Sequence, residues 1–206
     1  AERPSQRPSW NYRKSGGGGL TYDMVPHWRY VIEGMLGPIR RVAAATTIAI
    51  PERVDEEGRR FSVDVDDTSL TLAELASGAV GTIICSWATR VRRDDLVTLQ
   101  IDGTGGSALA GLHRCWMQSA ADTPTIRRFN PDTDIGEDYR AQWTEVADTT
   151  AYTNPYRVGW EAFLRHVVAD APLTCNFAAG LRDVRLAEAC YRSAAQRTWV
   201  SLDEIG

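Results

Sequence analysis

The sequence predicts an α+β domain with one large, mostly antiparallel sheet, helices packed on one face of it and the other face open for oligomerisation. Three observations support this fold class. A helical apolar stripe comes first, a long region of alternating apolar and polar residues follows, and two further helical stripes end the chain. The 206 residues suffice for one sizeable domain, which we place at residues 10–206.

The first helix is expected over residues 20–36, after a glycine run at 16–19. Apolar residues recur there three and four positions apart, and Gly37-Pro38 ends the pattern. Pro26 lies inside this segment. Because proline in a helix interior costs about 3 kcal/mol, we expect the regular helix to begin near Pro26, after an irregular first turn at residues 20–25.

Residues 40–118 are expected to supply at least five antiparallel strands, with turns such as the one at 103–106. One face is expected to be apolar and the other rich in hydroxyl groups. On the apolar, helix-covered face we place Leu70, Leu72, Ile83, Cys85, Trp87, Val97, Leu99 and Ile101. Residues 124–138 are expected to be mostly loop.

Two helices are expected to follow and to cover the apolar face. Asn154-Pro155 is typical of a helix start, and Asn176 is a candidate cap for the second helix. Their buried stripes are expected to be Tyr156, Trp160, Phe163, Leu164, Val167 and Val168, and then Leu181, Val184, Ala187, Tyr191 and Ala194. A last edge strand is expected at residues 199–202.

The second face of the sheet then has no helix left to cover it. We place Ala73, Leu75, Val80, Ile84 and Ala88 on this face. Because it is too apolar for full exposure to water, a second copy of the chain is expected to cover it. The sequence therefore predicts a homodimer, or a dimer of dimers.

Composition excludes several classes of protein. A net charge of −4 argues against a nucleic-acid partner, and the longest apolar runs are too short to cross a membrane. The four cysteines show no C-x-x-C pair, so we expect no metal site. Free, partly buried thiols fit a reducing cytoplasm.

The strongest candidates for chemistry are Asp23 and His27 at the start of the first helix. A carboxylate and an imidazole four residues apart on a helix can face the same way. The carboxylate favours the imidazolium and holds the ring, which suits proton transfer at a hydroxyl or carbonyl oxygen. The alternative is a surface pair or a helix-start contact without a catalytic role.

Other candidates surround this pair. The glycine run lets a ligand or another domain approach the backbone, so Gly18 and Gly19 are candidate cofactor contacts. Arg90 belongs to an arginine-rich turn that could meet an anionic group of a substrate, or whose charges could simply pair with one another. The remaining candidate substrate contacts are Tyr12, Arg13 and Arg29.

Five short motifs occur in a characteristic order: Trp10-Asn11-Tyr12-Arg13, Gly-Gly-Gly-Leu-x-x-Asp-x-x-x-His at 17–27, Leu36-Gly37, Asp66-Asp67 and Asp102-Gly103-Thr104-x-Gly106-Ser107. Over residues 10–202 the chain resembles the C-terminal domain of the glucose-fructose oxidoreductase / inositol dehydrogenase (Gfo/Idh/MocA) family. The resemblance implies that NAD(P) is bound by an N-terminal Rossmann domain outside this chain, with residues 1–9 as the linker. It also implies that His27 gives or takes the proton of the substrate hydroxyl beside Asp23. Val25-Pro26 departs from the family pattern, in which a glycine commonly precedes the histidine.

We therefore expect the substrate-binding and oligomerisation domain of a cytoplasmic, NAD(P)-dependent oxidoreductase that acts on a sugar, polyol or related hydroxy compound. The fragment alone is expected to be inactive and to bind no cofactor. It has no Gly-x-Gly-x-x-Gly turn between a strand and a helix, because the glycines at 103–106 lead into another strand. The alternative is a non-catalytic sensor or assembly module that has kept the fold.

Overall fold

The computed structural model describes residues 7–89, 95–125, 130–132 and 138–206. The chain divides into two compact units, one formed by residues 1–89 and 162–206 and the other by residues 90–161. Each unit has its own antiparallel four-stranded sheet, and helices and antiparallel strands together make an α+β fold, as predicted.

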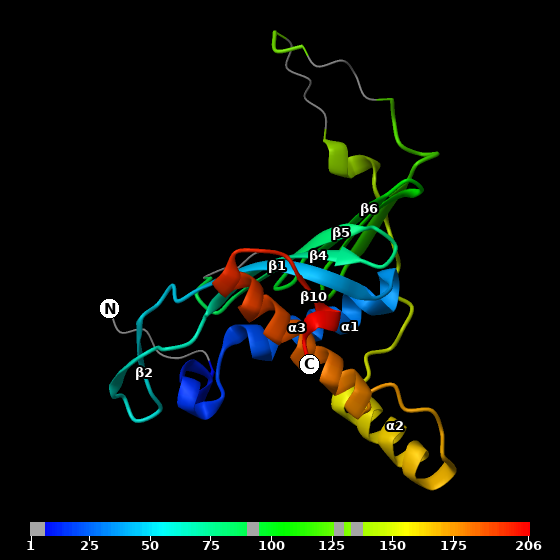
Figure 1. The fold of residues 1–206 in the computed structure, drawn as a ribbon. Coiled ribbons are helices and arrows are strands. Elements are labelled where there is room, and N and C mark those ends of the chain that lie inside the picture. The colour runs from blue at the N-terminus through cyan, green and yellow to red at the C-terminus, as the bar shows by residue number, and fades with distance from the viewer. Residues whose placement is uncertain (1–6, 90–94, 126–129, 133–137) are drawn as a thin grey trace. The chain divides into compact units, whose positions relative to one another are not determined.

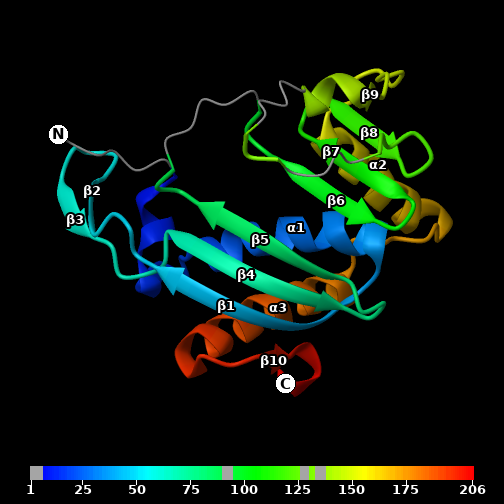
Figure 2. The same ribbon diagram turned by 90° about the horizontal axis from the view of Figure 1, so that it is seen from above.

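The first unit is a sheet with helices on one face. Strand order is β10-β1-β4-β5, and every pair is antiparallel. The strands are β1 (Ile39–Thr47), β4 (Thr68–Leu75), β5 (Val80–Ser86) and β10 (Val200–Ser201). Helices α1 (Leu20–Leu36) and α3 (Phe177–Gln196) lie on the same face of this sheet (Figures 1 and 2). The unit also contains η1 (Ser9–Tyr12), η2 (Lys14–Gly16), the hairpin β2 (Glu52–Val54) and β3 (Arg60–Ser62), and η4 (Leu202–Glu204).

The core of this unit lies between the sheet and the two helices. Ile83 and Cys85 of β5 point into it, as predicted, whereas Val80 and Ile84 point to the open face. Strand β4 has the opposite phase from the prediction. Its inward-facing residues are Ser69, Thr71, Ala73 and Leu75, while Leu70 and Leu72 lie half exposed on the open face.

The register explains this correction. Leu70 pairs with Ile84 and Leu72 with Thr82, so both leucines share the face on which Ile84 lies. The sequence pattern favoured leucine as the buried residue and hydroxyls as the solvated ones. Thr71 is nevertheless buried, and its hydroxyl lies 3.7 Å from the Cys190 sulfur in α3.

Helix α1 is regular from Leu20 onward, although Pro26 lies inside it. The predicted irregular turn at residues 20–25 is therefore wrong. The first backbone donors of the helix are satisfied from outside it, because Leu20 N–H donates to the Asp66 carbonyl (3.0 Å) and Thr21 N–H donates to Asp66 Oδ2 (3.0 Å). This support lets the helix begin six residues before the proline.

The second unit has strand order β6-β7-β8-β9, again antiparallel. Its elements are β6 (Leu99–Gly103), β7 (Gly106–Ala110), β8 (Cys115–Ser119), η3 (Tyr139–Gln142) and β9 (Thr144–Glu145). The predicted turn at 103–106 is confirmed, and a Cβ on Gly106 would overlap the Gln118 carbonyl of β8. The expected single sheet of at least five strands is wrong for the described residues. The alternation and the turn identified β6 and the strand after it, but not that they belong to a sheet separate from that of β1, β4 and β5.

Helix α2 (Pro155–Ala169) begins where predicted, and Asn154 Oδ1 accepts hydrogen bonds from Tyr156 N–H (2.9 Å) and Arg157 N–H (3.3 Å). Its apolar stripe does not pack as predicted: no residue of α2 is buried, and Trp160 is 65% exposed. Within the first unit, α1 and α3 are the helices that pack on the strands β1, β4 and β5.

Helix α3 also begins where predicted, because Asn176 Oδ1 accepts from Ala179 N–H (3.0 Å). Its buried stripe differs in part from the prediction: Leu181 and Val184 are half exposed. The buried residues of α3 are Leu186, Ala187, Ala189, Cys190 and Ser193. The predicted edge strand at 199–202 is confirmed as β10. None of the helices in the described parts of the chain is long and apolar enough to cross a membrane.

Candidate functional site

Other atoms of the same chain fill the space around the last two glycines before α1. Gly19 N–H donates to the Asn11 carbonyl (2.9 Å), and a Cβ on Gly18 would overlap the same carbonyl group. Gly19 has a φ of 132°, and a Cβ there would overlap the Tyr191 hydroxyl and lie 3.0 Å from Asp66 Oδ1. The close approach that these glycines allow is thus made within the protein. Both are buried, and a cofactor contact for either stays a prediction.

Asp66, just before β4, holds the start of α1. Its Oδ2 accepts hydrogen bonds from Thr21 N–H (3.0 Å) and from Thr21 Oγ1 (2.7 Å), and its Oδ1 accepts one from the Tyr191 hydroxyl of α3 (2.5 Å). Asp66 is itself buried. Burial of Tyr191 and its hydrogen bond to this carboxylate raise the pKa of Tyr191. One carboxylate therefore joins α1, α3 and the start of β4.

Asp23 and His27 lie one helical turn apart on α1, and the structure leaves the imidazole exposed. Asp23 forms an ion pair with Arg7 (3.3 Å), whose guanidinium also lies 6.0 Å from the centre of the Trp87 ring. Within the described residues, no hydrogen bond joins Asp23 to His27. The imidazole is thus accessible to a ligand, with a carboxylate one turn before it.

Tyr12 lies in the core and is fully buried. Its ring packs edge-on against Trp87, with 5.2 Å between centroids, and under the Arg53 guanidinium at 4.4 Å. Arg13 is exposed, and its guanidinium stacks 4.7 Å above the Phe61 ring. The structure gives Tyr12 a packing role, and substrate contacts for Tyr12 and Arg13 stay predictions.

Arg29 is buried and clamps α1 to α3. Its guanidinium donates to Asp183 Oδ1 (2.5 Å), Glu33 Oε2 (2.7 Å) and the Ala179 carbonyl (3.2 Å). These bonds lie inside the protein and involve all three guanidinium nitrogens, and a substrate contact for Arg29 stays a prediction. Arg90, the other predicted arginine, lies outside the described residues.

A pocket of about 590 Å³ adjoins the start of α1. Tyr22 and Glu188 form a hydrogen bond at its wall, and burial together with Glu188 raises the pKa of Tyr22 to about 12. Sequence reasoning missed Asp66, Tyr22 and Glu188 as parts of this region and treated Tyr191 only as a core residue. The Asp66-Asp67 motif was the available signal, but a motif at a strand start does not reveal which helix it holds.

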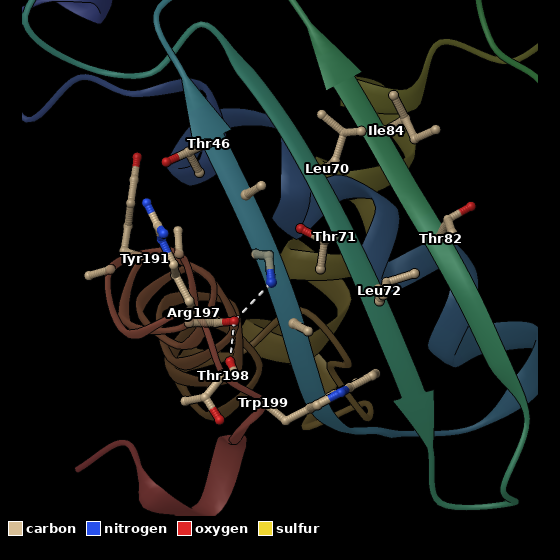
Figure 3. Close-up of a pocket in the computed structure, with 16 residues that line it drawn as sticks. Thr46, Leu70, Thr71, Leu72, Thr82, Ile84, Tyr191, Arg197, Thr198 and Trp199 are labelled. Atoms are coloured by element: carbon tan, nitrogen blue, oxygen red, sulfur yellow. Dashed lines mark hydrogen bonds between the residues drawn. The ribbon is translucent and has the colours of Figure 1, made fainter.

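A second pocket, of about 1050 Å³, lies beside β1, β4, β5 and the end of α3 (Figure 3). Leu70, Leu72 and Ile84 line it from the open face of the sheet, and Trp199 lines it from the segment after α3. Ser193 joins two parts of its wall, because its hydroxyl accepts from Ala44 N–H (2.8 Å) and donates to the Thr198 carbonyl (2.6 Å). This pocket is therefore part of an exposed apolar surface of the first unit.

Comparison with solved structures supports the fold. A levoglucosan dehydrogenase in complex with NADH and L-sorbose superposes with a TM-score of 0.72 at 23% identity, over 98% of this chain and 56% of that one. An oxidoreductase domain protein from Kribbella flavida gives a TM-score of 0.73 at 21% identity, over 98% and 57%. The α+β domain thus has the fold of a part of these oxidoreductases.

Sequence comparison defines the family. Residues 1–109 match the model of the GFO/IDH/MocA C-terminal domain, which is more than half of the chain, so the chain belongs to the Gfo/Idh/MocA family. It is 43% identical over 205 residues to a D-xylose dehydrogenase of Paenarthrobacter nicotinovorans, over 98% of this chain and 53% of that protein. It is 27% identical to a levoglucosan dehydrogenase of Pseudarthrobacter phenanthrenivorans, over 98% and 56%. The chain thus spans about half the length of these relatives.

Proposed function

We propose that this chain is the substrate-side and oligomerisation domain of an NAD(P)-dependent oxidoreductase that acts on a sugar, polyol or related hydroxy compound. The observation that carries the proposal is the exposed His27 on a helix whose start is fixed and which carries Asp23 one turn earlier. The family membership and the names of the two relatives support the same class of reaction.

The residues of this chain suit the proton step. Oxidation of an alcohol removes a hydride and a proton, and a nicotinamide held by a separate nucleotide-binding domain would accept the hydride. His27 takes the hydroxyl proton in this direction and returns it in the other, because an imidazole titrates near neutral pH. Asp23, one helical turn earlier, is the residue that we propose to orient the ring.

The glycine run does not fit a phosphate cradle. A cradle needs free backbone N–H groups at a helix start, whereas Gly19 N–H is bonded to Asn11 and the first N–H groups of α1 are bonded to Asp66. We therefore assign cofactor binding to a separate nucleotide-binding domain. A cytoplasmic location belongs to the same proposal and agrees with four free cysteines.

The oligomerisation role rests on the open face of the first unit. Leu70 and Leu72 are about half exposed, and Ile84 is 69% exposed beside Leu70. At one end of this face Arg41 pairs with Glu74 (2.6 Å), so a two-fold contact of the face with itself would leave neither of these two charges unpaired. A second copy of the chain is therefore the proposed occupant.

The test joins this chain to the part of the Paenarthrobacter D-xylose dehydrogenase that it does not match. The chimera should reduce NAD⁺ or NADP⁺ with at least one aldose, polyol or anhydrosugar. His27→Ala should lower kcat by about 10²- to 10⁴-fold with little change in cofactor affinity. His113→Ala, which removes an exposed histidine of the second unit, should leave kcat unchanged.

Two results contradict the proposal. An active chimera that keeps its kcat after His27→Ala would remove the assigned role of the imidazole. A chimera that folds and binds cofactor but oxidises none of these compounds would favour the alternative of a non-catalytic sensor or assembly module.

A further inference from the structure

We propose that Asp66 is a positioning residue for the Asp23/His27 pair. It would act by capping α1 from the start of the neighbouring strand. This inference rests on the proposed function, because it assigns Asp66 a role in the geometry of the residues that carry the proton step.

Asp66 replaces the capping side chain that α1 lacks. The residue at the cap position is Gly19, and no side chain there bonds to the helix. A helix usually gains this bond from a serine, threonine, asparagine or aspartate at the cap, which accepts from the second or third N–H group of the helix. Here Asp66 Oδ2 accepts from Thr21, the second helical residue, and the Asp66 carbonyl accepts from Leu20, the first. The cap thus comes from 45 residues away in the sequence.

The packing around the cap leaves no room for an ordinary one. A Cβ at Gly19 would overlap the Tyr191 hydroxyl and crowd Asp66 Oδ1, so a local capping side chain and the Asp66–Tyr191 hydrogen bond exclude each other. Tyr191 comes from α3, so the Asp66 cap also fixes the first turn of α1 against a second helix.

The first turn of α1 depends on this cap more than a usual helix start does. Pro26 has no N–H, so one bond of the helical ladder is missing at its position, between the first turns and the rest of the helix. The missing bond would join Pro26 to the Tyr22 carbonyl, so Asp23 lies within the turn that has lost a bond and His27 follows that turn. Asp66 holds the residues just before this turn, and the body of α1 holds those after it.

Loss of the cap should displace Asp23 relative to His27 while the core remains folded. Misplacement of a catalytic group by about 1 Å can lower a rate by about 10²-fold. In the chimera, Asp66→Ala should therefore lower kcat by about 10- to 100-fold with a much smaller change in KM, and should shift the pH profile of kcat. In this chain, the same change should speed amide hydrogen exchange at residues 20–25 selectively.

Two variants separate positioning from general stability. Asp66→Asn keeps a carbonyl oxygen for Thr21 and should recover most of kcat. Asp64→Asn changes an exposed carboxylate that accepts from Lys14 N–H (2.6 Å), and it should change neither kcat nor exchange at residues 20–25. If Asp66→Ala does not fold, Tyr191→Phe is the substitute variant. It removes one of the three hydrogen bonds that the Asp66 carboxylate accepts, and it should lower kcat and speed exchange at residues 20–25 by smaller amounts.

The outcomes distinguish this inference from the proposed function. If His27→Ala abolishes activity but Asp66→Ala, or Tyr191→Phe in its place, leaves kcat and its pH profile intact, Asp66 has no positioning role and the proposed function stands. If Asp66→Ala leaves amide hydrogen exchange at residues 20–25 unchanged, Asp66 does not stabilise the first turn of α1 and the inference fails. If His27→Ala has no effect, both the proposed function and the positioning role fail.

Discussion

Arg53 and Asp67 form an ion pair of 3.1 Å in which both side chains are almost completely buried, at 1% and 0% exposure. Asp67 also accepts hydrogen bonds from Ala49 N–H (2.7 Å) and Ile50 N–H (3.0 Å), and Arg53 lies over the Tyr12 ring. The neighbouring carboxylates Asp66 and Asp67 thus serve different elements. Asp66 holds the start of α1, and Asp67 holds the segment after β1 and the strand β2.

Removal of Arg53 should destabilise the protein strongly. Arg53→Ala leaves the Asp67 charge buried without its partner, and losses of this kind cost about 3–5 kcal/mol. Arg59→Ala is the matched control, because Arg59 pairs with Asp55 but is 72% exposed, and exposed ion pairs contribute little to stability. Urea unfolding of the two variants measures the difference. A similar loss of unfolding free energy in both variants would show that the buried ion pair stabilises the fold no more than the exposed one does.

Several elements of both units could be predicted from the sequence because their signals are local. Helix starts at Asn154 and Asn176, the edge strand before Leu202 and the turn at 103–106 each depend on neighbouring residues, and each is confirmed. The phase of β4 could not be predicted in this way. It depends on the register with β5 and on partners such as Cys190, which lies 119 residues from Thr71 in the sequence.

The candidate site shows the same limit. The spacing of Asp23 and His27 is a local property of one helix, and the structure keeps both on α1 with His27 exposed. Arg29 bonds to α3 and Tyr12 packs against Trp87, so both of these candidate substrate contacts are buried by long-range contacts that local spacing does not reveal. The cap from Asp66 is a long-range contact, and it also explains why Pro26 does not end the first turn.

The buried thiols should make the stability depend on pH in the alkaline range. Burial raises the pKa of Cys85 to about 11 and that of Cys190 to about 12, against an ordinary value of about 8.5. Both thiols stay protonated in the folded state while the unfolded chain ionises. Their stabilisation is therefore complete below about pH 8.5 and decreases as the pH rises through the folded-state values.

Chemical denaturation between about pH 7 and pH 11 should show this loss. A thiol reagent added near neutral pH should modify the exposed Cys175 and the partly exposed Cys115, and should reach Cys85 and Cys190 only after unfolding. Cys175→Ser should leave the pH dependence of stability unchanged. Rapid modification of all four cysteines in the folded chain would contradict the assignment.

The open face of the first unit should mediate self-association. Leu70 and Ile84 are paired neighbours on that face, and β1 adds the small side chains of Ala43 and Ala45 beside them. Sedimentation equilibrium at micromolar concentration should give twice the mass of the chain, or four times if dimers pair further. Ile84→Lys should shift the association equilibrium toward the monomer, because it would bury an unpaired charge in the contact.

Val168→Lys is the matched control, because Val168 is also aliphatic and 83% exposed but lies on α2. If Val168→Lys dissociates the oligomer and Ile84→Lys does not, the interface lies on α2 and not on the open face. If the unmodified chain is a monomer, something other than a second copy covers this face.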